Sequence, residues 1–583
     1  MRPGELTLTK RLLSLSALNA GAKVLDIGCG EGQTVDYLNG KGGVEAWGID
    51  LKPGTGERAG ERLITGRAET LPFGTASFDA VLFECSFSVI ADPDAALSEA
   101  ARVLKPDGLV YMADLYAPGE TAEFPGLPWR IETWETLVAR FTAAASNGVT
   151  RAGFRVSCFE DHSAELLSWW AGLLFEDGQN SNTNITLPKG FKAGYFLAVL
   201  EKEPFTPEGL AKYRKEKREE AVRRARENSP FYREHGGGFI NADTIVEQGE
   251  RMLCVPLGDV ARIRTLQSSG STGAPKRIWF TQGDMERTIA FFSRGMRPLV
   301  RQGGTCIAML SKDTPGSVAD LLRRGLERNG VNCVIQGVIQ GPEAAETVRE
   351  TSLQAAGSLC YVGLPAELFW LCRHAPDLHP ETVLLSADYV SDSITKVLAE
   401  EWGCRVFTHY GMTETCYGLA VQCSAGNFVP CTQRGHHLRP EDYIVEIIDD
   451  SGAELPPGQE GEIVITSLKN EAMPLLRYRT GDIGSLITEP CPCGSLLPRL
   501  GKIRGRREYL KNRLNIHMLD DLLFALPDIK GYRAALDRDI LRLTFEGGAA
   551  NEKDLSEKLG IEVRVDYGTV LPYGGKRELE ISG

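Results

Sequence analysis

The stretch Thr265–Lys276, TLQSSGSTGAPK, is the part of this chain from which the rest can be interpreted. Two apolar-leaning segments, Val260–Leu266 and Arg277–Thr281, flank a run of Ser, Thr and Gly that ends in Pro-Lys. Glycines let backbone N–H groups approach an anion, hydroxyls donate further hydrogen bonds, and Lys276 adds a positive charge. A P-loop of ordinary NTPases would end in Gly-Lys-Ser/Thr, which is absent here. The stretch therefore predicts an anion-binding loop of another kind, with a flexible Ser/Gly linker as the alternative.

The composition is that of a globular protein with several domains. The 583 residues predict three or four domains, and 42% hydrophobic with 25% charged residues supply ample core. A net charge of −13 argues against a nucleic-acid surface, and no apolar run approaches the length of a membrane span. The 14 cysteines follow no disulfide framework, and the first ten residues lack an apolar signal core. We expect a cytoplasmic protein that contacts neither nucleic acid nor membrane.

The loop SSGSTGAPK resembles the phosphate loop of the adenylate-forming (acyl-CoA synthetase) superfamily, in the form found in phenylacetate–CoA ligases. The resemblance covers roughly residues 205–583, because further stretches follow in the family's order. They are LLSADYV (Leu384–Val390), FTHYGMTET (Phe407–Thr415), PLLRYRTGD (Pro474–Asp482), LGKIRGRREYL (Leu500–Leu510) and, more weakly, LPYGGKREL near the C-terminus. Several ordered motifs are far more specific than any one of them.

This resemblance implies an ATP site built from separate segments. Lys276, Thr413, Glu414 and Lys576 are the implied catalytic residues, with Thr413 at the α-phosphate and Lys576 as the adenylation lysine. Glu414 would ligate Mg²⁺, because a carboxylate beside a polyphosphate is unfavourable unless a hard cation bridges them. The implied ATP- and AMP-binding residues are Ser268, Ser269, Gly270, Ser271, Thr272 and Gly273 at the phosphates, Ser386, Ala387, Asp388, Tyr410, Gly411 and Met412 around the adenine, and Asp482 and Arg506 at the ribose.

A strand and a glycine-rich turn open the N-terminal module. Val24–Ile27 is apolar, and GCGEGQ follows, with glycines at alternate positions. That spacing is typical of a nucleotide-binding turn, although Gln33 stands where a dinucleotide fingerprint has Gly or Ala. Asp26 suits a positively charged amino-acid moiety better than a pyrophosphate. A second strand, Val44–Ile49, ends at Asp50, whose carboxylate can accept both ribose hydroxyls.

This N-terminal pattern resembles the class I S-adenosylmethionine-dependent methyltransferases, particularly the ubiquinone-biosynthesis-like group. The match is good over roughly residues 10–115 and poor over 116–203. The implied cofactor-binding residues are Asp26, Gly28, Gly30 and Gly32 at the methionine part, Asp50 at the ribose, and Ala68 and Glu69 beside the adenine. Arg67 departs from the pattern, because relatives carry an Asp there. An NAD-binding fold and a decayed, non-catalytic cofactor fold remain as alternatives. The sequence identifies no methyl acceptor, and it gives Glu84 and Cys85, which stand where relatives face one, no role.

Cysteine placement predicts a structural zinc site. Cys491 and Cys493 form a Cys-Pro-Cys-Gly turn, while Cys423 and His437 flank a distant insertion. Two close ligands with two distant ones can form a tetrahedral site, and phenylacetate–CoA ligase-like proteins similarly have Cys, His and Cys-x-Cys in these places. Cys431 and His436 are competing ligands, and uncoordinated loop thiols are the alternative.

We expect an α/β protein with a Rossmann-like seven-stranded methyltransferase domain, followed by an adenylate-forming fold with a large α/β domain and a small α+β lid. The expected boundaries are 1–203 for the methyltransferase domain, 204–236 for a linker helix and ligase entry, 237–500 for the adenylating domain and 501–583 for the lid. Within the linker, the charged run Lys212–Arg226 mixes both signs and predicts a solvated helix. In the lid, Glu508 replaces the Asp that relatives have at the hinge, and NRLNIHM replaces a Gly-containing turn, which leaves the lid's rotation open.

The expected function is bifunctional: an S-adenosylmethionine-dependent methyltransferase fused to an ATP-dependent, AMP-forming carboxylate–CoA ligase. Its cofactors and co-substrates would be S-adenosylmethionine, ATP with Mg²⁺, coenzyme A and structural zinc, and the resemblance implies an aromatic acid. The alternatives are an adenylating enzyme that passes the acyl group to an amine or a carrier protein, and a scaffold or ligand sensor with decayed sites.

Overall fold

The computed structural model describes residues 3–582, except 17, 19–20, 42, 55–61, 124–129, 143–152, 177–192, 204, 267–274, 312–314, 424–434, 512–513, 573, 575–576 and 578. The chain separates into two compact units. The first comprises residues 1–209 with the short segment 490–497, and the second comprises residues 210–489 with 498–583. No helix in the described ranges is long and apolar enough to cross a membrane.

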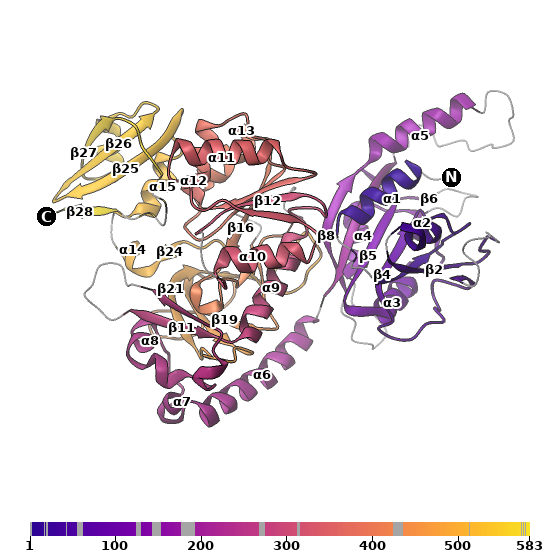
Figure 1. Cartoon of the computed structure of the whole chain (residues 1–583), viewed down its shortest axis with the longest axis horizontal. Helices are drawn as coiled ribbons and strands as arrows, with labels where there is room; N and C mark the ends of the chain where they lie inside the picture. The colour runs from indigo at the N-terminus through magenta and orange to yellow at the C-terminus, as the bar shows by residue number, and fades with distance from the viewer. Residues whose placement is uncertain are drawn as a thin grey trace. The chain divides into compact units, whose positions relative to one another are not determined.

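A seven-stranded sheet forms the centre of the first unit (Figure 1). Its strands in spatial order are β3 (Leu63–Thr65), β2 (Glu45–Asp50), β1 (Lys23–Ile27), β4 (Phe78–Glu84), β5 (Leu104–Tyr116), β9 (Gly194–Lys202) and β8 (Phe154–Asp161). All neighbours are parallel except those of β9, which runs antiparallel to β5 and β8. The strand order reverses beside β1, and ligands bind at such a switch point in open α/β sheets.

Both faces of this sheet are covered, as its nearly continuous apolar strands require. Along β4, Val81 and Phe83 pack into one buried cluster, while Ala80 and Leu82 pack into another. The covering helices are α1 (Glu5–Ser14), α2 (Gln33–Lys41), α3 (Pro93–Val103), α4 (Trp134–Thr142) and α5 (Ser163–Glu176). The predicted Rossmann-like, seven-stranded domain is confirmed.

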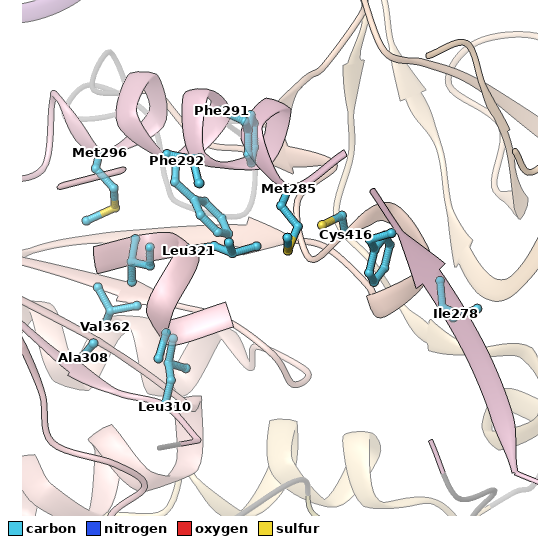
Figure 2. Close-up of a cluster of buried hydrophobic side chains, with 14 of the residues drawn as sticks. Ile278, Met285, Phe291, Phe292, Met296, Ala308, Leu310, Leu321, Val362 and Cys416 are labelled. Carbon is cyan, nitrogen blue, oxygen red and sulfur yellow. The ribbon is translucent and has the colours of Figure 1, made fainter. Parts of the chain in front are cut away.

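The second unit is built around a nine-stranded sheet. Five parallel strands lead it, in the order β13 (Asn332–Ile335), β12 (Thr305–Met309), β14 (Leu359–Gly363), β15 (Thr382–Leu385) and β16 (Arg405–Tyr410), followed by the short strands β17 (Ala420–Val421), β18 (His436–Leu438), β23 (Arg499–Leu500) and β22 (Leu486–Ile487). The helices between the parallel strands are α10 (Val318–Glu327), α11 (Pro342–Leu353), α12 (Pro365–His374) and α13 (Asp392–Glu401). Figure 2 shows Phe292 and Met296 of α9 (Gln282–Met296) near Leu321 of α10 and Val362 of β14, within one buried cluster.

Two antiparallel elements carry the rest of the adenylating motifs. The hairpin of β10 (Arg262–Leu266) and β11 (Lys276–Phe280) pairs Leu266 with Lys276, so the predicted phosphate loop connects its two strands. A four-stranded sheet contains β19 (Tyr443–Ile448), β20 (Gly461–Ser467), β21 (Tyr478–Gly484) and β24 (Gly505–Arg506). The helices α6 (Pro207–Asn228), α7 (Pro230–Glu234) and α8 (Ala242–Gln248) precede this hairpin along the chain.

The C-terminal region is a small α+β element, as predicted. Its sheet contains β27 (Glu562–Tyr567), β26 (Ile540–Gly547), β25 (Ile529–Asp537) and β28 (Glu580–Ser582), and its helices are α14 (Arg507–Lys511), α15 (Ile516–Leu523) and α16 (Glu552–Leu559). Tyr532 and Phe524 of this region share a buried cluster with Phe369 and Trp370 of α12. The Trp370 indole also donates to the Val570 carbonyl at 2.8 Å. The lid is therefore packed against the large domain in this structure.

Candidate active sites

The glycine turn after β1 has a left-handed backbone at all three of its glycines. Gly28, Gly30 and Gly32 have φ angles of 80°, 51° and 80°, values that glycine adopts without strain. A Cβ atom on Gly28 would lie 2.3 Å from the Cβ of Ser86, whereas one on Gly30 would meet nothing within 4 Å. Gly28 thus permits the turn to pack closely against Ser86, and there is free space beside Gly30.

Two carboxylates flank this turn, one on each of the neighbouring strands. Asp26 is buried on β1, with 3% of its surface exposed. Asp50 ends β2 and accepts the backbone N–H of Gly30 at 3.0 Å and that of Lys52 at 3.0 Å. Each carboxylate oxygen of Asp50 can still accept a further hydrogen bond, which a pair of ribose hydroxyls would supply.

The residues implied beside the adenine lie on the next turn. Glu69 is half-buried, and its carboxylate forms an ion pair with Arg67 at 3.0 Å. Arg67, the departure from the family pattern, is exposed, and Ala68 packs against the core of the unit. Glu69 is therefore already engaged by a cation in this structure, so the implied adenine site differs in charge from one with an Asp at position 67.

Several polar groups that the sequence analysis left without a role gather at the ends of β4 and β5. Cys85 follows β4 with a φ of 54°, unusual for a residue with a side chain, and its Sγ lies 3.1 Å from the hydroxyl of Tyr195. Asp114 is buried at the end of β5 and accepts the Ser88 N–H at 3.0 Å; burial raises its pKa. Tyr195 lies far away in the sequence, and no local pattern pointed to it.

In the second unit, Glu414 lies at the centre of a buried group of charges. It sits on a single 3₁₀ turn, Thr413–Thr415, after β16, with 6% of its surface exposed. Its carboxylate forms an ion pair with Lys276 and accepts the Tyr478 hydroxyl at 2.9 Å. Burial alone would raise the pKa of Glu414, but the Lys276 charge and these hydrogen bonds hold the pKa below its ordinary value. Glu414 is therefore ionised at neutral pH, and Lys276 is its cationic partner in this structure.

Tyr478 was not singled out from the sequence, although it stands inside the motif RYRTGD. The same motif places Asp482, which accepts the Tyr410 hydroxyl at 2.7 Å. Arg506 is paired with Asp482 across β21 and β24, and its Nε lies 3.9 Å from the carboxylate. Tyr410, Asp482 and Arg506, predicted as nucleotide contacts from three separate motifs, thus lie together.

The segment Ser386–Asp388 follows β15. The Ser386 hydroxyl lies 2.9 Å from Nδ1 of His409, and Ala387 adopts a left-handed φ of 70°. Asp388 accepts the backbone N–H of Arg577 at 3.1 Å. Arg577 directly follows the predicted adenylation lysine, so this part of the lid lies against the implied adenine segment.

Gly411, Met412 and Thr413 form the turn between β16 and Glu414. A Cβ on Gly411 would lie 2.1 Å from the Tyr417 carbonyl, so only glycine fits there. The remaining predicted residues of the ATP site, Lys576 and the loop residues Ser268, Ser269, Gly270, Ser271, Thr272 and Gly273, lie outside the described residues. The competing zinc ligand Cys431 does so as well.

The four predicted zinc ligands come together. One ligand atom each from Cys423, His437, Cys491 and Cys493 lies within 4.8 Å of all the others. The three cysteines are buried. The competing ligand His436 is engaged elsewhere, with Nε2 at 2.7 Å from the Thr408 hydroxyl and Nδ1 at 3.3 Å from the Leu500 carbonyl. Three thiols and one imidazole at this separation could hold a metal ion.

Comparison with known proteins agrees with both units. A family model described as a methyltransferase domain matches residues 25–112, and one described as an AMP-binding enzyme matches residues 265–470. The solved structure of a 2-hydroxyisobutyryl-CoA ligase in complex with 2-HIB-AMP aligns with a TM-score of 0.52 at 17% identity, covering 62% of this chain and 87% of that one. The chain therefore joins a methyltransferase domain to an AMP-binding domain with the adenylate-forming fold.

Curated relatives exist for each half. The phenylacetate–coenzyme A ligase of Thermus thermophilus is 27% identical over 292 residues, which are 48% of this chain and 62% of the relative. The demethylmenaquinone methyltransferase of Renibacterium salmoninarum is 29% identical over 200 residues, which are 32% of this chain and 81% of the relative. The chain thus spans about three fifths of the length of the Thermus ligase. The second unit is similar to CoA ligases, and the fusion predicted from the sequence is confirmed.

Proposed function

We propose that the second unit is an AMP-forming carboxylate–CoA ligase. The observation that supports this proposal best is the buried group in which Glu414 holds Lys276 and Tyr478, with Asp482 and Tyr410 beside it. In the first half-reaction, a carboxylate oxygen of the acid attacks the α-phosphorus of ATP, and pyrophosphate leaves. In the second, the thiol of coenzyme A attacks the carbonyl carbon of the acyl-adenylate, and AMP leaves.

The side chains have separate roles in this scheme. Asp482 and Arg506 orient the ribose, and Ser386–Asp388 borders the adenine. Mg²⁺ at Glu414 would neutralise the phosphate charge, and Lys276, released from its ion pair, would then contact phosphate oxygens. Because most of this work is positioning and charge stabilisation, no residue of the second unit needs to become covalently modified.

ATP–pyrophosphate exchange that depends on a carboxylic acid tests this proposal. The similarity to phenylacetate–CoA ligases favours an aromatic acid. AMP release that requires coenzyme A separates this ligase from an enzyme that transfers the acyl group to an amine or a carrier protein. The second candidate, a scaffold with decayed sites, would bind ATP without supporting exchange.

For the first unit we propose methyl transfer from S-adenosylmethionine to a small molecule in the same cytoplasmic setting. The open turn at Gly30 and the carboxylates of Asp26 and Asp50 fit this cofactor, which supplies an already activated methyl group. The protein then has to hold the acceptor in line with that methyl group and exclude water. In this proposal, the Cys85–Tyr195 pair and the buried Asp114 would contact the acceptor.

Asp50→Ala should weaken S-adenosylmethionine binding by about 1.5–3 kcal/mol, because a charged acceptor of two hydroxyl groups is lost. Calorimetry on the full chain would measure the change, with Asp107→Ala, an exposed carboxylate of the same unit, as the matched control. Melting curves would show whether losing the Gly30 and Lys52 hydrogen bonds unfolds the turn. Tight binding of NAD without any binding of S-adenosylmethionine would contradict the assignment.

We also propose that Cys423, His437, Cys491 and Cys493 hold a structural zinc ion. A closed site of four ligands contributes to folding rather than to chemistry. Cys493→Ser should therefore lower the melting temperature and remove the bound metal, while Cys254→Ser, a thiol outside the cluster, should change neither. Elemental analysis of the purified protein without near-stoichiometric zinc would refute the site.

A further inference from the structure

The helix α6 was predicted to be a solvated helix, but it contacts the rest of the second unit at several separate points. Its buried residues are Leu210, Ala221 and Ala225. The Tyr213 hydroxyl donates to the Glu441 carbonyl at 3.0 Å, and the Arg224 guanidinium donates to the Asn470 carbonyl. Figure 1 shows α6 as one long continuous helix that leads to α7. A side of the helix between these anchors faces a hollow.

This hollow is a groove of about 950 Å³ between α6 and the sheet that carries β19. The size is that of pockets which hold small organic ligands. Arg214, Arg218 and Arg226 line it from the helix, and Ile444, Glu446 and Glu454 line it from the other side. Five basic and four acidic side chains line the groove in all, and a neighbouring hollow shares Arg218 and Arg226 and adds Arg477.

Three arginines that line the groove from α6 have no hydrogen-bond or ion-pair partner among the described residues. Among the residues that the structure describes, Arg214, Arg218 and Arg226 form no hydrogen bond or ion pair, and Nε and Nη2 of Arg214 are buried. Burial also lowers the pKa of the Arg214 guanidinium. Like charges four residues apart, as at 214 and 218, destabilise a helix. A guanidinium presents a planar fork of donors that matches phosphate oxygens, so an anionic ligand would satisfy this row.

Glu446, on the other side of the groove, needs a hydrogen-bond donor, whereas the arginines need an acceptor. It is 93% buried, since 7% of its surface is exposed, and its Oε2 has no hydrogen-bond partner. Its Oε1 lies 3.7 Å from the Arg477 guanidinium. A buried carboxylate oxygen requires a donor, which a bare phosphate dianion cannot supply but a hydroxyl group can. The carboxylates of the groove also repel an extended polyanion such as nucleic acid.

We propose that the groove along α6 binds a phosphorylated small molecule that also carries hydroxyl groups, such as a sugar phosphate. The arginines on α6 hold the phosphate, and Glu446 accepts a hydrogen bond from a hydroxyl. None of these side chains belongs to the candidate ATP, S-adenosylmethionine or zinc sites. The groove is therefore a third small-molecule site, separate from both proposed reactions.

Calorimetric titration of the full chain with ribose 5-phosphate tests the proposal, with inorganic phosphate and ribose as probes for its two halves. The arginine and lysine variants on α6 distinguish binding in the groove from binding at the proposed adenylation site. Ribose 5-phosphate should bind saturably and about tenfold more tightly than phosphate, because only the sugar phosphate satisfies Glu446. Ribose alone should not bind.

The variant Arg218→Gln/Arg226→Gln should weaken ribose 5-phosphate binding at least about tenfold, as expected for charge-assisted hydrogen bonds. Both side chains are exposed, so folding should be unaffected. Lys212→Gln/Lys217→Gln makes the same charge change on α6 outside the groove and should bind like the wild type. Glu446→Leu, which removes the acceptor, should make the affinities for ribose 5-phosphate and phosphate equal. The proposal is overturned if the wild type shows no saturable binding, or if the arginine and lysine variants behave alike.

Discussion

Glu414→Gln is expected to slow adenylate formation by a factor of about 10² to 10³. The amide keeps the size of the side chain and can still accept the Tyr478 hydroxyl, but it cannot neutralise Lys276 or hold Mg²⁺ against the phosphates. The lost charge is buried, where electrostatic interactions are much stronger than at the surface. Acid-dependent ATP–pyrophosphate exchange measures the effect.

Glu460→Gln is the matched control for this variant. Glu460 pairs with Arg504 at 2.7 Å, but both side chains are about half exposed, so its loss should leave exchange unchanged. A melting curve of Glu414→Gln checks that the unpaired Lys276 has not unfolded the turn. Exchange at the wild-type rate in a folded Glu414→Gln protein would show that Glu414 is not at the reacting phosphates.

Lys576→Ala is expected to reduce adenylate formation about a hundredfold, comparable with the loss of one electrostatic donor to the transition state. The lysine would neutralise charge that develops between the attacking carboxylate and the α-phosphate. Its neighbour Arg577 donates to Asp388 of the implied adenine segment, which supports this placement. Pyrophosphate release during single turnover measures the first half-reaction.

The same variant should leave thioester formation intact when an acyl-adenylate is supplied chemically, since we expect that step to use another orientation of the lid, in which Lys576 is away from the acyl-adenylate. Glu508→Pro should do the reverse, because stiffening the exposed hinge would retain adenylation and impair transfer to the thiol. Unchanged pyrophosphate release by Lys576→Ala would remove this lysine from the reaction. Loss of both half-reactions together would point to damage of the packed lid instead.

Much of the fold could be predicted because its signals are local. The strand–glycine-turn pattern around Asp26 and the loop before Lys276 each fix a short segment, and parallel α/β folds follow from alternating strands and helices. The order of strands and the packing of the lid on α12 depend on contacts between distant residues. Trp370 and Val570 are 200 positions apart, and no pattern in the sequence predicts their contact.

The candidate sites were predictable to the extent that family motifs carry them. Glu414, Asp482 and Arg506 lie in quoted motifs, and the structure brings each beside a second predicted residue. Tyr478 was overlooked although it lies in such a motif, because a tyrosine between two arginines is normally interpreted as a residue that packs in the core. The pairing of Cys85 with Tyr195 depends on β9 returning beside β5, which the sequence does not reveal.

The charged helix α6 shows where sequence reasoning stops. Mixed charges at Lys212–Arg226 predict a solvated surface, and several of these side chains are indeed exposed. Whether a charged face meets bulk water or a groove depends on the sheet opposite, and Glu446 lies more than 200 residues away along the chain. Burial of single polar atoms is a property of tertiary structure and cannot be read from composition.

Acid-dependent ATP–pyrophosphate exchange by the full chain, measured over a panel of aromatic and aliphatic carboxylic acids, tests the central claim most directly. The account predicts that at least one acid, most readily an aromatic one, supports exchange in the wild type, and that the Glu414→Gln protein loses it. A folded wild-type protein that binds ATP yet exchanges pyrophosphate with none of the acids would contradict the account and identify the second unit as a binding module.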